Sequence, residues 1–158
     1  MSKIKTVGIV GTGVIGTGWI IRNLAHNKIV HAYDQNKNLK NYDLKEIKRT
    51  SKSIKKLFGK KILIKNLKFF NSLEKALSNV DFVQESVLEN YKVKTDLIQK
   101  ISKYVKSNVI ISSSSSGLLP SKIFSKCKNP QRGIIGQPFN RAYLLPAVEI
   151  VPGKKTTR

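Results

Sequence analysis

The residues with the clearest capacity for chemistry form a glycine-rich segment near the N-terminus. The segment has the spacing G-x-G-x-x-G and consists of Gly11, Thr12, Gly13, Val14, Ile15 and Gly16. In such a loop the first glycine permits a tight turn, the second lets a pyrophosphate approach the backbone, and the third lets a helix pack closely on a strand. A helix that begins here presents free N–H groups and a positive partial charge. The segment therefore predicts a binding site for a dinucleotide pyrophosphate.

The surroundings of this loop strengthen the prediction, because glycines at this spacing also recur by chance. An apolar strand pattern, Thr6–Val10, precedes the loop, and a helical pattern over residues 14–27 follows it. The next predicted strand, Ile29–Tyr33, ends in an acid, Asp34. The alternative is a glycine-rich turn in an α/β domain that binds no ligand.

Asp34 is placed to accept hydrogen bonds from both hydroxyls of a ribose. Its carboxylate would repel a 2′-phosphate, so we expect NAD rather than NADP as the cofactor. No arginine follows Asp34 to pair with such a phosphate, although Lys37 is a nearby cation that could do so. The alternative role for Asp34 is to cap a helix after the strand.

Strand and helix patterns alternate along the rest of the chain. Further strands are expected at residues 67–70, 80–85, 109–111, 134–135 and 147–151, and helical segments at residues 39–63 (one long helix or a pair), 72–77, 91–105 and 120–127. This alternation is typical of a parallel sheet with helices on its faces. We expect an α/β, Rossmann-type, doubly wound and mainly parallel sheet, with residues 1–158 forming one domain.

The composition is strongly basic, with 30 Lys and Arg against nine Asp and Glu and a formal net charge of +21. Such a balance is common in nucleic-acid-binding proteins. Few of these residues are arginine, the lysines are scattered, and aromatic residues do not alternate with them as in single-strand binders. We expect no nucleic-acid partner, and attribute the excess of lysine to nucleotide bias in the source genome.

The remaining bulk features favour a cytoplasmic protein. Cys127 is the single cysteine and cannot form an internal disulfide, which suits a reduced compartment. No apolar run approaches the roughly 18 residues of a membrane span, and the N-terminus lacks the pattern of a signal peptide. We expect no membrane partner and no metal site.

Several segments together resemble the 3-hydroxyacyl-CoA dehydrogenase superfamily over essentially the whole chain. They are residues 11–16, 83–94, 112–121 and 136–140, continuing to Val148-Glu-Ile-Val151. Residues 143–146 are similar to the L-carnitine dehydrogenase branch, and residues 118–124 to the lambda-crystallin (L-gulonate 3-dehydrogenase) branch. The resemblance implies NAD-dependent oxidation of a 3-hydroxy acid or 3-hydroxyacyl-CoA to the 3-oxo compound, and a place for the family in fatty acid metabolism.

The resemblance also implies roles for individual residues. Glu89 and Lys94 would line the nicotinamide end of the cofactor site, although Lys94 has the alternative of a solvated helix lysine. Ser116 would bond to the 3-hydroxyl of the substrate, or be one loop serine among several. Asn140 would contact the cofactor or the substrate carbonyl. Glu149 would orient a catalytic histidine, or be a buried acid paired elsewhere.

That histidine is absent, because the family motif Gly-His-Pro-Phe-Asn reads Gly136-Gln-Pro-Phe-Asn140 in this chain. An imidazole can take the hydroxyl proton near neutral pH, whereas the amide of Gln137 can only donate or accept hydrogen bonds. His26 and His31 lie in the nucleotide half and are not expected to replace it. Three explanations stay open: a one-base change or sequencing error, a binding-competent but catalytically weak homologue, or a base supplied by another group.

The chain ends shortly after the last predicted strand, with no further helical pattern. In the family a C-terminal helical domain holds the substrate and forms the dimer, and we expect that domain to be missing here. The substrate would lie between that domain and Ser116, Gln137 and Asn140. The main alternative is a non-catalytic NAD-binding module, which the glutamine at position 137 favours.

Overall fold

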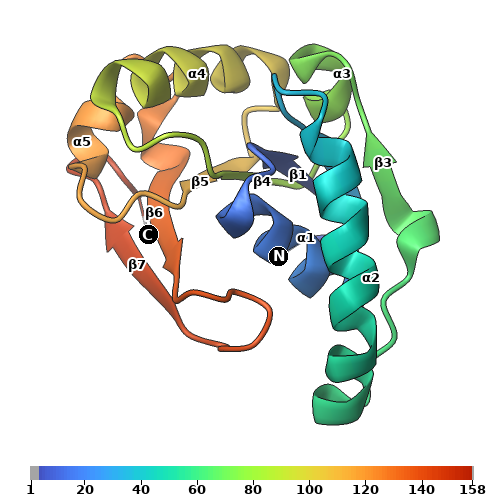
Figure 1. Cartoon of the computed structure of the whole chain (residues 1–158). Coiled ribbons are helices and arrows are strands. Elements are labelled where there is room, and N and C mark those ends of the chain that lie inside the picture. Colours follow the sequence, from blue (N-terminus) through green and yellow to red (C-terminus); the bar gives the residue numbers. More distant parts are fainter. Residues whose placement is uncertain (1–3, 158) are drawn as a thin grey trace.

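The computed structural model describes residues 4–157, in which seven strands form one sheet in the order β3-β2-β1-β4-β5-β6-β7 (Figure 1). Neighbouring strands from β3 to β6 run parallel, and β7 runs antiparallel to β6. The strands are β1 (Thr6–Val10), β2 (Ile29–Tyr33), β3 (Leu67–Phe69), β4 (Phe82–Glu85), β5 (Ile110–Ser113), β6 (Gly133–Pro138) and β7 (Val148–Pro152).

The helices occupy the segments in which the sequence predicts them. They are α1 (Val14–Ala25), α2 (Leu39–Phe58), α3 (Leu73–Leu77), α4 (Tyr91–Tyr104) and α5 (Pro120–Ile123), with short 3-10 turns at Ile64–Asn66 and Pro130–Arg132. The region from residue 39 to 63 contains a single long helix rather than a pair. Helix α2 ends at Phe58 and is followed by Gly59, whose positive φ of 64° suits a residue without a Cβ and stops the helix.

Helices cover both faces of the sheet, which confirms the predicted doubly wound architecture (Figure 1). On one face, α1 and α2 contribute Ile20, Ile21, Leu24, Ile47 and Ile54 to a cluster of buried apolar side chains. On the other face, α3, α4 and α5 contribute Ala76, Leu77, Ile98, Ile101 and Ile123 to a second cluster. No helix within residues 4–157 is long and apolar enough to cross a membrane.

The strand order reverses direction at β1. Strands β2 and β3 lie on one side of β1, whereas β4, β5 and β6 lie on the other. At such a switch point the loops after two neighbouring strands turn to opposite faces and leave a crevice at the carboxyl ends of the strands. The predicted phosphate loop follows β1 directly and therefore lies at this crevice.

The last two strands form a hairpin-like pair at the end of the sheet. Their register places Gln137 directly opposite Glu149, and Ile135 opposite Val151. Strand β7 is exposed along its whole length. The two closing strands predicted from the sequence are thus present, and their pairing brings together two residues assigned to the site.

Helix α4 begins with a side-chain cap, since the Oδ1 atom of Asn90 accepts a hydrogen bond from the Val93 amide at 3.1 Å. Asn90→Ala removes this bond, and we expect it to lower the free energy of unfolding by about 1 kcal/mol. Asn90→Asp keeps an acceptor and should unfold within a few tenths of a kcal/mol of the wild type. Urea unfolding followed by circular dichroism measures both variants. Equal stability of all three proteins would contradict the cap.

Candidate functional site

The glycine loop after β1 has the geometry that its spacing predicts. Gly11 has a φ of +87°, and a Cβ added to it would lie 2.7 Å from the Ser86 carbonyl oxygen. A Cβ on Gly16 would lie 1.8 Å from the carbonyl oxygen of Gly11. Around Gly13, by contrast, no atom of the described residues other than Gly13 and its two chain neighbours lies within 4 Å of an added Cβ. The first and third glycines allow the turn to close, and the second leaves open space above the backbone.

The open space above Gly13 adjoins the start of helix α1. Gly13 occupies the N-cap position and has no side chain that could bond to the first amide groups of the helix. The first turn of α1 also carries no acidic side chain in this chain. A phosphate placed there would meet N–H donors and the positive end of the helix dipole. These residues therefore fit the pyrophosphate of a dinucleotide.

Asp34 lies at the end of β2, next to the same loop. Its Oδ2 atom accepts a hydrogen bond from the Thr12 amide at 2.7 Å, and its Oδ1 atom accepts one from the Asn36 amide at 2.8 Å. These bonds hold the carboxylate at the rim of the crevice. Each oxygen retains acceptor capacity for a ribose hydroxyl, because a carboxylate oxygen can accept two hydrogen bonds.

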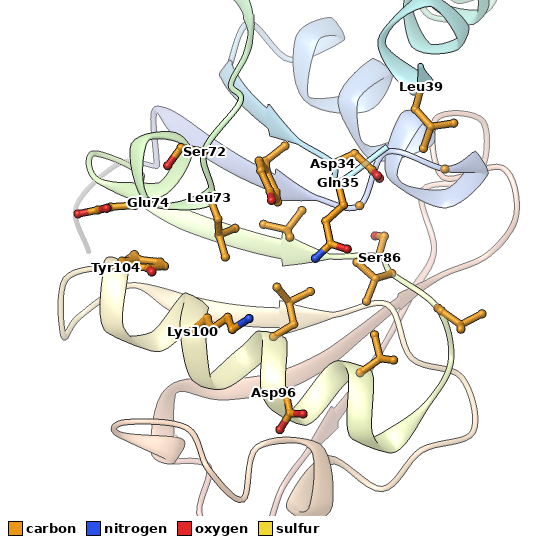
Figure 2. A pocket seen from close by; sticks show the side chains of 18 residues that line it. Asp34, Gln35, Leu39, Ser72, Leu73, Glu74, Ser86, Asp96, Lys100 and Tyr104 are labelled. Atoms are coloured by element: carbon orange, nitrogen blue, oxygen red, sulfur yellow. The ribbon is translucent and has the colours of Figure 1, made fainter. Parts of the chain in front are cut away.

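A cleft of about 770 Å³ begins at the loop and continues between the end of β2 and helix α4 (Figure 2). Gly11, Gly13 and Asp34 are among its lining residues. Figure 2 shows Asp34 and Gln35 on one wall and Lys100 of α4 on the opposite wall. The cleft is large enough for a nucleoside and its phosphates.

A second cavity of about 270 Å³ lies on the other side of the phosphate loop. Gly13 lines the large cleft and Ile15 lines this smaller cavity, so the loop separates the two. Its other lining residues are Ser114, Ser116, Gln137, Pro138, Phe139 and Asn140. The structure thus brings together three residues that the family resemblance assigns to substrate and cofactor, namely Ser116, Gln137 and Asn140.

Glu149 lies across the β6–β7 pair from Gln137. Side chains directly opposite each other in an antiparallel pair share one face of the sheet, with Cβ atoms about 5 Å apart. The register thus places a carboxylate opposite position 137, and its role in orienting a side chain there stays a prediction. Glu149 is exposed, so the alternative of a buried acid paired elsewhere is wrong.

Lys94 is buried, which contradicts the alternative of a solvated helix lysine. Its side chain is 1% exposed, and its Nζ atom lies 2.8 Å from Glu85 and 3.5 Å from Glu89. Neither Glu89 nor Lys94 is among the described residues that line the two cavities. Their placement at the nicotinamide end stays a prediction. In this structure Glu89 bonds to the adjoining serine loop, and Lys94 pairs with Glu85 and Glu89.

Glu89 holds that loop through one oxygen atom. Its Oε1 accepts hydrogen bonds from the Ser115 hydroxyl at 2.6 Å and from the amides of Ser116 and Gly117 at 2.8 and 3.0 Å. Burial alone would raise the pKa of Glu89, but these bonds and the Lys94 ammonium outweigh it and hold the pKa below its usual value. The carboxylate therefore fixes the backbone that carries Ser116 into the smaller cavity.

Sequence reasoning missed a buried acid beneath the phosphate loop. Asp43 of α2 is completely buried, and its Oδ1 lies 2.6 Å from the hydroxyl of Thr17 in α1. The same hydroxyl lies 2.9 Å from the Thr12 carbonyl oxygen within the loop. The signal was present in the sequence, because Asp43 shares the apolar stripe of α2 with Ile47 and Ile54 rather than its lysine-rich face.

Burial raises the pKa of Asp43 to about 6, although hydrogen bonds from Thr17 and Thr12 act in the opposite direction. Its Oδ2 atom has no hydrogen-bond partner in the described part of the chain. Below about pH 6 the protonated side chain places no negative charge under the loop, whereas at higher pH the carboxylate is ionised.

Residues 6–158 match the family described as "3-hydroxyacyl-CoA dehydrogenase, NAD binding domain". The L-carnitine dehydrogenases of Oceanobacillus iheyensis and Pseudomonas putida are each 40% identical to this chain, over 98% and 99% of its length and 51% and 49% of their own. The dehydrogenase part of multifunctional enzyme 1 from C. elegans superimposes with a TM-score of 0.86 at 29% identity, over 98% of this chain and 36% of that one. The chain spans about half the length of the curated relatives that it matches.

The buried Asp43 generates a pH-dependent stability. Its pKa is about 6 in the folded protein against 3.8 for the free group, so the folded state binds the proton more tightly than the unfolded chain. This tighter proton binding stabilises the folded state fully below about pH 4, and the stabilisation is lost as the pH rises through about 6. Asp43→Asn keeps the shape without the charge. We expect it to gain about 2–3 kcal/mol relative to the wild type between pH 4 and pH 7.5.

Urea unfolding of both proteins across this pH range measures the difference. Other titrating groups are common to the two proteins and cancel in the comparison. A difference that stays constant from pH 4 to pH 7.5 would show that Asp43 is ionised in the folded state throughout.

Proposed function

Because the chain belongs to the family of 3-hydroxyacyl-CoA dehydrogenase NAD-binding domains, we propose that it binds NAD(H) across the phosphate loop. The adenosine half would occupy the large cleft beside Asp34, and the nicotinamide half would reach the smaller cavity beside Ser116. The observation that carries this proposal is the loop itself. Gly11 and Gly16 pack closely against each other, and this leaves the Gly13 backbone open to a phosphate. One cavity lies on each side of the loop.

The preference for NAD over NADP rests on Asp34. The amides of Thr12 and Asn36 hold its carboxylate at the rim of the large cleft. A 2′-phosphate on the adenosine ribose would lie against this negative charge, whereas a 2′-hydroxyl would donate a hydrogen bond to it.

The proposed reaction is the oxidation of a 3-hydroxy acid, or its thioester, to the 3-oxo compound. NAD⁺, when bound, accepts the hydride that leaves the substrate. Ser116 and Asn140 supply polar groups at the smaller cavity, where they would orient the substrate hydroxyl and carbonyl groups. The relatives named L-carnitine dehydrogenase support a small, polar 3-hydroxy acid as substrate. We propose that the half of those relatives that this chain does not match completes the substrate site and forms a dimer.

Gln137 supports a second candidate function, a binding protein with weak or no catalysis. The family places a histidine at this position, and an amide cannot accept the hydroxyl proton at neutral pH. Gln137 can still hold a carbonyl oxygen through its NH₂ group and can pair with Glu149 across the strands. The loss of the base would lower the rate by about 10²–10⁴-fold.

A fluorescence titration with NADH and NADPH tests the cofactor proposal. The chain has one tryptophan, Trp19 in α1, which reports on the loop. We expect saturable binding with NADH favoured at least about tenfold, equivalent to about 1.4 kcal/mol. Asp34→Asn keeps the acceptor for the Thr12 amide but removes the charge, and should reduce the difference in affinity between NADH and NADPH. A chain that is folded by circular dichroism and binds neither nucleotide would refute the proposal.

Gln137→His tests the arrangement around the missing base. The new imidazole would face Glu149 across the strand pair, so its pKa should lie about half a unit above that of the double variant with Glu149→Gln. An NMR titration of the ring protons measures both values. Identical pKa values in the two variants would show that Glu149 does not reach position 137.

The same substitution separates the enzyme from the binding protein. In a fusion of this chain to the second half of the O. iheyensis enzyme, Gln137→His should raise turnover of L-carnitine by about 10²–10⁴-fold. A fusion that folds and binds NADH, yet gains no activity from the histidine, would favour the non-catalytic function.

A further inference from the structure

Two serine hydroxyls lie between the cavities, where β4 and β5 end. Ser86 follows β4 and Ser114 follows β5, and their Oγ atoms are 2.9 Å apart. Ser86 lines the large cleft, where Figure 2 labels it, whereas Ser114 lines the smaller cavity. The pair thus connects the two halves of the proposed cofactor site, and neither serine has a role in the function described above.

The neighbours of Ser114 decide which hydroxyl donates. Trp19 Nε1 lies 3.2 Å from the Ser114 Oγ, and Gln84 Nε2 lies 2.7 Å from it. The indole N–H can only donate. The Gln84 nitrogen is identified as the NH₂ group because it also lies 3.1 Å from the carbonyl oxygen of Gly136, which can only accept.

Both lone pairs of Ser114 are therefore occupied by donors. A serine hydroxyl has two acceptor lone pairs and one proton, so the Ser114 proton must point to the remaining neighbour, Ser86. Ser86 accepts this bond and keeps its own proton. Within residues 4–157 that proton has no other acceptor among the hydrogen bonds of Ser86.

The free donor of Ser86 lies beside the phosphate loop. The Ser86 carbonyl oxygen would be 2.7 Å from a Cβ on Gly11, so the Ser86 backbone is packed against the first glycine. Gly11, Gly13 and Ser86 line the same cleft. A ligand that crosses from the cleft to the smaller cavity passes this hydroxyl, and an oxygen atom on that ligand would satisfy it.

We propose that Ser86 is a cofactor-binding residue. Its hydroxyl donates a hydrogen bond to an oxygen of the pyrophosphate or of the ribose beyond it, and Trp19, Gln84 and Ser114 position that proton. This assignment rests on the proposed binding of NAD(H). It predicts that four residues outside the glycine loop, Ser86 and the three that position its proton, determine how tightly the middle of the cofactor is held.

Titrations of Ser86→Ala and Ser86→Thr with NADH test the assignment. The alanine variant should bind NADH about three- to tenfold more weakly, as expected for one lost hydrogen bond. The threonine variant retains the hydroxyl and should bind within about twofold of the wild type. Ser78→Ala, on the exposed C-cap of α3, serves as the matched control and should leave binding unchanged. Circular dichroism checks that each variant is folded.

ADP-ribose, which lacks the nicotinamide ring, serves as a second probe. Ser86→Ala should weaken it by the same factor as NADH, because both contain the pyrophosphate and both riboses. A loss confined to NADH would place the contact on the nicotinamide and overturn the assignment. Ser114→Ala should shift the emission of Trp19 in the free protein and weaken NADH binding less than Ser86→Ala does.

The outcomes separate this proposal from the function on which it rests. If the folded wild type does not bind NADH, both are refuted. If the wild type binds NADH and Ser86→Ala binds it equally well, only the role of Ser86 is refuted.

Discussion

A buried ion pair between Glu85 and Lys94 connects the elements that carry the candidate site. Glu85 ends β4 at the switch point of the sheet, and Lys94 comes from the first turn of α4. Removing two charges from water is costly unless every remaining polar atom is bonded. That condition is met here, since Glu85 also accepts hydrogen bonds from the Val87 amide and the Ser113 hydroxyl, and Lys94 also donates to the Val87 carbonyl oxygen. The pair therefore fixes β4, β5 and α4 relative to one another.

The polar groups around this pair continue into the site. Lys94 lies 3.5 Å from Glu89, which in turn holds the amides of Ser116 and Gly117. One residue further along the chain from Glu85 and Ser113, Ser86 and Ser114 form the hydrogen-bonded pair between the two cavities. Buried polar networks of this kind specify one arrangement, because each unmet bond would be costly. The serine-rich segment after β5 is thus a positioned part of the site, and its serines have distinct partners.

Position 137, where the family resemblance implies a histidine and this chain has glutamine, lies in a well-defined frame. Strands β6 and β7 retain the register that places position 137 opposite Glu149, and Gln137, Ser116 and Asn140 line one cavity. Gln137 is not among the described residues that line the large cleft. The phosphate loop follows β1 whereas position 137 lies in β6, so the proposed cofactor binding and the proposed proton transfer depend on different elements.

The sequence alone determined the features that depend on local patterns. The glycine spacing, the acid after the second strand and the alternation of strands and helices are set by backbone geometry and periodicity within short segments, and the fold follows from them. The tertiary structure decided which polar side chains are buried. Lys94 and Asp43 lie on helices rich in lysine and are buried because distant elements pack over them, whereas Glu149 is exposed because β7 is at the sheet edge. The proton direction at Ser86 depends on residues from α1, β4 and the segments after β4 and β5. No local pattern contains that information, because a hydrogen bond between distant segments exists only once the sheet has brought them together.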